Sequence, residues 1–133
     1  MFLAVQRSGL DQPGGFLTTM STVSTQQWDY PNAWAPLQHF VIEGFVQTQD
    51  KNLTNLAVQT AGRWVYSNYL AYQTRGVMYE KYNALDPGQG GGAGEYTPQE
   101  GFGWTNGVVL VLLEKYGLII SSRQTEAELR SRG

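Results

Sequence analysis

The sequence has 133 residues, 41% of them hydrophobic and 13% aromatic, which is enough apolar material for one small globular domain. Its formal net charge of -2 and its lack of lysine or arginine clusters exclude the basic surface that a nucleic acid or an anionic membrane requires. With no cysteine and one histidine, His39, it has no disulfide, no thiolate nucleophile and no Cys- or His-based metal site, so we expect no cofactor.

The N-terminal part of the chain is predicted to contain little regular structure. Residues 1–10 look like the end of an apolar helix, which Pro13 and the two following glycines terminate. Residues 16–27 are rich in Ser and Thr, have no helical period and are expected to be extended or loop. Because Tyr30 precedes a proline, helical backbone angles are disfavoured there, and residues 26–32 are predicted to form an ordered loop.

Three helices are predicted after this loop, which makes the chain all-α. Residues 33–48 carry apolar side chains at helical spacing, and so do residues 53–73. Residues 105–116 form the third, with Gly117 as its C-cap, and residues 121–133 are expected to be a polar, disordered tail outside the domain of residues 1–120.

The third helix is apolar on every side. Residues 108–113 are all Val or Leu, a run far too short to span a bilayer, so we expect no membrane segment. Such a helix must be buried between neighbours, and a chain of this length has too few helices to surround it. We therefore expect exposed apolar surface and self-association. The compartment stays open: Asn52 begins a glycosylation sequon, which matters only in a secreted or membrane-attached protein.

Residues 80–107 have little to contribute to a core. Two carboxylates, Glu80 and Glu95, flank a run of glycines, and several aromatic residues lie around them. Glycine is favoured where backbone approaches a ligand closely or moves. Aromatic faces beside carboxylates suit a sugar, which offers C–H faces for stacking and hydroxyls for hydrogen bonding. A flexible linker between helices is the alternative interpretation.

Two segments carry a family resemblance. Residues 26–36, QQWDYPNAWAP, resemble one signature of the trehalase family, and EKY at 80–82 followed by GGGAGEY and QEGFGWTNG resembles the other. Order and spacing both match, and the resemblance covers about residues 13–116, which correspond to the C-terminal quarter of a family member. It implies a section of an (α/α)6 barrel. Thr25 and Ala93 depart from the usual glycines of these motifs, small changes that remove no catalytic group.

The resemblance also implies a reaction: anomer-inverting hydrolysis of α,α-trehalose to two glucoses by an acid and a base about 6.5–9.5 Å apart. It assigns Glu80 as the general base and Glu95 as a ligand of sugar hydroxyls, although their roles could be exchanged. It places the following residues near the glucose sites: Gln27, Trp28, Asp29, Asn32 and Trp34. For Trp28 and Trp34, sugar stacking and structural packing stay equally open.

The resemblance also shows what this sequence lacks. The family's general acid, an Asp in an upstream segment, and its upstream arginine-rich motif have no counterpart here. We therefore expect a C-terminal piece of a trehalase that is inactive alone. The alternative is a non-catalytic carbohydrate-binding fragment, or one that depends on assembly with other segments.

Overall fold

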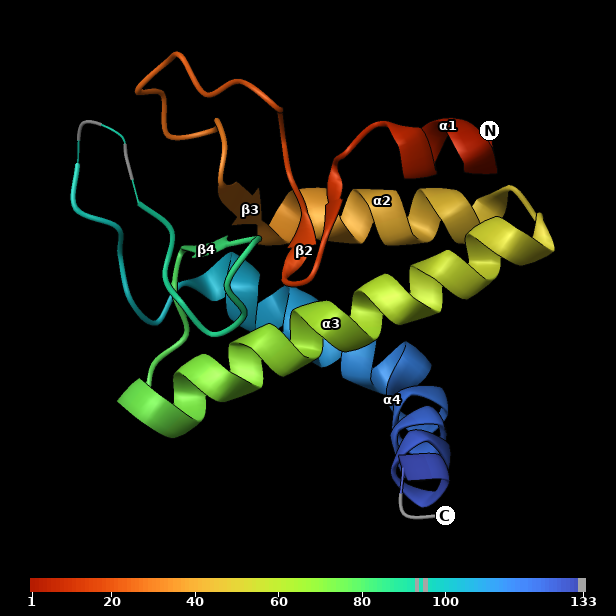
Figure 1. Ribbon diagram of the computed structural model, residues 1–133. Helices are drawn as coiled ribbons and strands as arrows, with labels where there is room; N and C mark the ends of the chain where they lie inside the picture. Colours follow the sequence, from red (N-terminus) through yellow and green to blue (C-terminus); the bar gives the residue numbers. More distant parts are fainter. Residues whose placement is uncertain (93, 95, 132–133) are drawn as a thin grey trace.

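The fold is mainly helical. The structure is a computed structural model that describes residues 1–92, 94 and 96–131. Figure 1 shows three long helices, α2 (Ala35–Gln47), α3 (Lys51–Arg75) and α4 (Gly103–Ser131), with the short α1 (Phe2–Arg7) near the turn between α2 and α3. Four strands of two or three residues complete the described chain. The all-α prediction is confirmed, and the strands are confined to the loops.

Helices α2 and α3 form an antiparallel hairpin, and both were predicted to within about two residues. Pro36 lies in the first turn of α2, where its missing N–H is not needed. Helix α3 begins at an N-cap, Asp50, whose side chain accepts hydrogen bonds from the amides of Asn52 and Leu53. It ends at Gly76 with φ of 70°, a left-handed C-cap.

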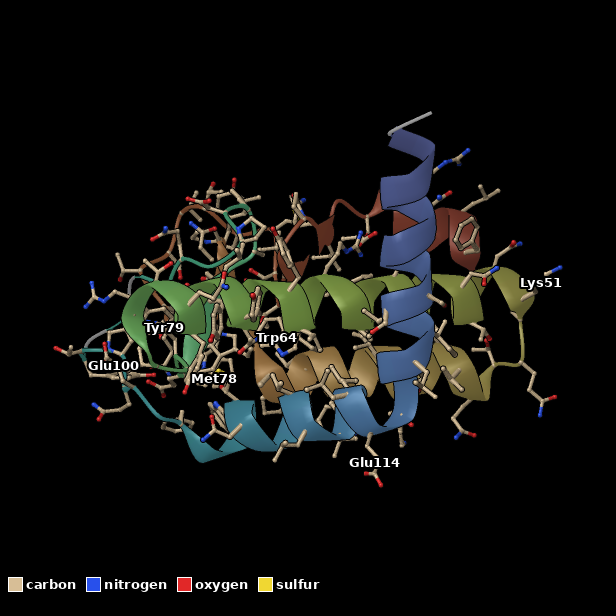
Figure 2. The ribbon with its side chains drawn as sticks, turned by 90° about the horizontal axis from the view of Figure 1, so that it is seen from below. Lys51, Trp64, Met78, Tyr79, Glu100 and Glu114 are labelled. Atoms are coloured by element: carbon tan, nitrogen blue, oxygen red, sulfur yellow. The ribbon has the colours of Figure 1, made fainter. Side chains whose placement is uncertain are left out.

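Helix α4 packs against this hairpin and is much longer than predicted. Glu43 of α2 accepts hydrogen bonds from Lys115 (2.8 Å) and from the Tyr116 hydroxyl (3.0 Å), which ties α4 to α2. Figure 2 shows that α4 changes direction close to Glu114 and then continues. The predicted end at Gly117 is wrong, because the helix runs through that residue to Ser131. Residues 121–131 are thus helical in the structure, and the division of the chain at residue 120 stays a prediction.

Much of α4 is exposed. Val108 and Leu112 are buried in the core, but Leu110, Leu113 and Leu118 are exposed, the last at 90%. Tyr66, Tyr69 and Tyr72 on α3 are also exposed, and a hollow of about 900 Å³ lies between these two apolar surfaces. By length and composition alone, residues 103–122 could cross a membrane, but one such helix does not show a membrane segment.

The N-terminal hairpin was not predicted as strands. Strand β1 (Asp11–Gln12) pairs antiparallel with β2 (Gly15–Phe16). The buried side chain of Gln38 on α2 accepts from the Phe16 amide (2.7 Å) and donates to the Phe16 carbonyl (2.8 Å), which fixes the hairpin to the helix. The Gly14 amide donates to the carbonyl of Ala84 (2.7 Å), and a Cβ at Gly14 would lie 2.9 Å from that oxygen. The hairpin therefore supports the segment that follows β4.

The second strand pair brings the two signature segments together. Strand β3 (Asn32–Trp34) pairs antiparallel with β4 (Lys81–Asn83), with Trp34 opposite Lys81 and Asn32 opposite Asn83. Both strands lie at one end of the helical array in Figure 1, away from the turn between α2 and α3. Figure 2 shows the same arrangement, with Tyr79 and Glu100 at one end and Lys51 at the other. The site is therefore built where loops meet at one end of the helices.

Candidate active site

Both carboxylate oxygens of Glu80 accept hydrogen bonds from the protein. Its Oε1 accepts a hydrogen bond from the Tyr96 hydroxyl (3.0 Å), and its Oε2 accepts one from the backbone amide of Gln99 (3.0 Å). Its own amide donates to the Gln99 carbonyl (2.9 Å). The residue is 6% exposed and directly precedes β4. A buried carboxylate with both oxygens bonded has one orientation and keeps lone pairs free for a further ligand.

Trp104 and Trp34 pack against each other next to Glu80. The indole N–H of Trp104 donates to the backbone carbonyl of Glu80 (3.0 Å), and the ring of Trp34 meets Trp104 edge to face at 5.7 Å. Trp28 stacks on the other side of Trp34, with ring centroids 4.2 Å apart. Trp34 is 1% exposed and serves packing, whereas Trp28 is 41% exposed and presents a free part of its ring. That either tryptophan contacts sugar stays a prediction.

Asn32 joins the first signature to the glycine-rich segment. Its side-chain amide donates to the carbonyls of Gln27 (3.1 Å) and Gly92 (2.9 Å). It is fully buried, and its Oδ1 has no hydrogen-bond partner among the residues that the structure describes. A Cβ at Gly91 would lie 2.5 Å from this oxygen, so only glycine fits there. Asn32 therefore links Gln27 to the glycine-rich segment.

Asp29 stabilises the loop of the first signature. One carboxylate oxygen accepts from the Thr19 hydroxyl (2.8 Å), and the other accepts from the hydroxyl of Ser24. These hydroxyl groups, that of Ser24 first, hold the pKa of Asp29 below its usual value. Asp29 therefore holds the loop of the first signature through its two hydroxyl partners.

Lys81 is one of the residues of this site that the sequence analysis missed, together with the Glu80 partners Tyr96, Gln99 and Trp104. It is fully buried, and its Nζ lies 5.4 Å from the ring centroid of Trp34 and 5.5 Å from that of Tyr96. Burial lowers the pKa of the ammonium group, and the nearby charge of Glu80 opposes this shift. Its position within EKY, next to a carboxylate that the resemblance makes catalytic, was the only signal in the sequence.

The structure therefore brings Glu80 and four of the predicted binding residues, Gln27, Asn32, Trp28 and Trp34, into one connected cluster. Asp29 stabilises the loop that carries Gln27 and Trp28. Glu95 lies outside the described residues, so its distance from Glu80 is not defined here. Within the described residues, no group of three or more His, Asp or Glu side chains could hold a metal ion.

Comparison with known proteins gives one consistent result. Residues 2–117 match the family profile described as Trehalase. A probable trehalase of Oryza sativa subsp. japonica is 49% identical over 114 residues, which are 86% of this chain and 20% of that protein. The trehalase of Homo sapiens is 53% identical over 92 residues, 69% of this chain and 16% of the relative. The fold of neutral trehalase from Saccharomyces cerevisiae matches 86% of this chain and 21% of that one, with a TM-score of 0.59 and 23% identity. The chain thus spans about a fifth of the length of these proteins.

Proposed function

Because the chain belongs to the trehalase family, we propose that it supplies the base-bearing section of an α,α-trehalase and that Glu80 is the general base. Its helices are a section of an (α/α)6 barrel, incomplete in this chain. The reaction proposed for the assembled enzyme is hydrolysis of trehalose to two glucoses with inversion. In such a reaction an acid protonates the bridging oxygen while a base removes a proton from the attacking water.

One observation carries this proposal: the way the Glu80 carboxylate is held. The hydroxyl of Tyr96 and the amide of Gln99 fix its two oxygens, and Trp104 fixes its backbone carbonyl. A base must lie within hydrogen-bond reach of the water it activates, and a carboxylate held in one orientation meets this need without further ordering.

The remaining site residues have supporting roles in this proposal. The exposed part of the Trp28 ring is a face on which a glucose can stack. Asn32 acts through the glycine-rich segment, which it links to Gln27, and Glu95 is proposed to bind sugar hydroxyls. The general acid comes from a segment upstream of this sequence, so the isolated chain is expected to be inactive.

The test joins this chain to the upstream part of a trehalase and measures glucose release. The isolated chain should give no turnover, and the joined protein should be active. In the joined protein, Glu80→Gln should lower kcat by about 10²–10⁴-fold with nearly unchanged KM. The amide can accept from the Gln99 N–H and donate to the Tyr96 hydroxyl oxygen, so the geometry is kept while the base is lost. Glu95→Gln should mainly raise KM.

Glu100→Gln is the matched control, because Glu100 is an exposed carboxylate in the same loop region, and it should leave both constants within about twofold.

Anion rescue makes the test sharper. In Glu80→Ala, added azide should attack a glucosyl donor with a good leaving group and form a glucosyl azide, because the anionic nucleophile needs no base. Full kcat in Glu80→Gln together with loss of kcat in Glu95→Gln would exchange the two roles. Turnover by the isolated chain would show that the general acid lies within it.

A further inference from the structure

The buried lysine of β4 has no role in the function proposed so far. Lys81 lies opposite Trp34 in the strand pair, and its side chain is fully buried. A charged side chain is rarely buried unless specific interactions compensate for the water it loses. The ring faces of Trp34 and Tyr96, each within 5.5 Å of the ammonium nitrogen, provide such interactions, since the face of an aromatic ring attracts a cation.

Lys81 also lies against the glycine-rich segment, at Gly91 and Gly94. Its backbone carbonyl accepts a hydrogen bond from the Gly91 amide (2.9 Å). A Cβ at Gly91 would lie 2.8 Å from Lys81 Cγ, and a Cβ at Gly94 would lie 3.6 Å from Lys81 Nζ. The lysine stem therefore packs under Gly91, and its ammonium group lies under Gly94 and beside the ring of Tyr96.

The contact of Lys81 with the ring of Tyr96 connects the lysine to the proposed base. Tyr96 is the residue whose hydroxyl donates to Glu80 Oε1, and the Gln99 amide three residues later donates to Oε2. Whatever fixes the ring of Tyr96 also fixes the direction of its hydroxyl, because the ring is rigid. Tyr96 itself is 39% exposed, so packing alone holds it weakly.

We propose that Lys81 is a positioning residue, whose buried ammonium group, held between the rings of Trp34 and Tyr96, fixes the glycine-rich segment and through it the orientation of the Glu80 carboxylate. This inference deepens the proposed function and rests on it for the role of Glu80. The lowered pKa of Lys81 is consistent with its removal from water.

A lysine that only fills space would behave differently from one that acts through its charge. Methionine has a similar length and flexibility without the charge, so Lys81→Met keeps the packing of the stem against Gly91 and removes the cation. Arginine keeps the cation and also stacks on aromatic rings, so Lys81→Arg should restore what Lys81→Met loses. Lys115→Met is the matched control. It removes the cation of a half-exposed lysine on α4, which pairs with Glu43 of α2 and not with the candidate site.

Hydrogen exchange on the 133-residue chain tests the proposal without any enzymatic activity. In Lys81→Met, the amides of Gly91, Gly94 and Gln99 should exchange at least about tenfold faster than in the wild type, while amides in the middle of α3 should not change. Lys81→Arg should restore slow exchange, and Lys115→Met should leave these three amides unaffected. Unchanged exchange in Lys81→Met, equal acceleration in α3, or failure of arginine to restore protection would overturn the proposal.

The joined trehalase described above gives the second measurement. There Lys81→Met should lower kcat by about 10–100-fold with KM within about twofold, since the base is misdirected while the sugar contacts remain. Unchanged kcat, or a change in KM alone, would overturn the positioning role. If the joined wild-type protein releases no glucose, the proposed function fails, and the exchange experiment still decides whether Lys81 holds the segment.

Discussion

Gln38 connects the N-terminal hairpin to α2, and replacing it provides a quantitative test of the packing described above. The amide of Leu17 donates to the carbonyl of Leu10, so the next pair, Asp11 and Phe16, is of the non-hydrogen-bonded kind. The N–H and C=O of Phe16 therefore point away from β1, toward Gln38. The side-chain amide of Gln38 forms hydrogen bonds with both the N–H and the C=O of Phe16, as the backbone of a neighbouring strand would.

Gln38→Met keeps the length of the side chain and removes both hydrogen bonds. Each buried backbone group left without a partner costs about 1–3 kcal/mol, so the two together cost about 2–6 kcal/mol. The more apolar methionine side chain recovers about 1 kcal/mol. We therefore expect the free energy of unfolding to fall by about 3 kcal/mol, a large part of the about 5–15 kcal/mol typical of a domain.

Urea unfolding followed by tryptophan fluorescence measures this change. Gln73→Met is the matched control, because Gln73 lies exposed on α3, and it should change the free energy of unfolding by less than about 0.5 kcal/mol. An unchanged urea midpoint for Gln38→Met, at an unchanged slope, would refute the reasoning, since it would mean that the amide and carbonyl of Phe16 are satisfied without Gln38.

Two further predictions concern alkaline stability and association. Burial raises the pKa of the Tyr82 hydroxyl to about 12, above its usual value near 10, so the folded state favours the neutral form. The resulting stability is complete below about pH 10 and is lost as pH rises toward 12, at about 1.4 kcal/mol per pH unit. Tyr82→Phe should reduce this slope, whereas Tyr66→Phe on the exposed face of α3 should not; equal slopes in all three proteins would contradict the assignment to Tyr82. The exposed side chains of Leu113 and Leu118 should make the chain self-associate at micromolar concentration, through an apolar patch of several hundred Å². Sedimentation should show smaller species for Leu118→Lys, and a monomeric wild type at this concentration would disprove the expectation.

The sequence predicted the helices better than the loops, because helical periodicity is a local signal. The bounds of α2 and α3 were correct to about two residues, since repeated apolar spacing defines them. Gly117 misled the prediction for α4. A glycine inside a helix costs only about 1 kcal/mol, so the apolar residues that follow it continue the helix.

The strands and the buried lysine could not be predicted in the same way. A strand of three residues is too short for an alternating pattern, and β3 and β4 are far apart in the sequence. Lys81 is a charged residue in a polar stretch, and its ammonium group lies beside two aromatic rings, of Trp34 and Tyr96, from other segments. The residues of the candidate site were found through motif resemblance, whereas their contacts required the fold.

The pairing of β3 with β4 also has a consequence for the order in which the chain folds. It closes a loop of about 50 residues that contains all of α2 and α3. Closing so long a loop for two strands of three residues costs more conformational entropy than their few hydrogen bonds return. We expect the helical hairpin to form first and to bring the two ends together, so that the cluster around Glu80 assembles only afterwards. Pulsed hydrogen exchange during refolding would show this order as protection of the α3 amides before the Gly91 amide.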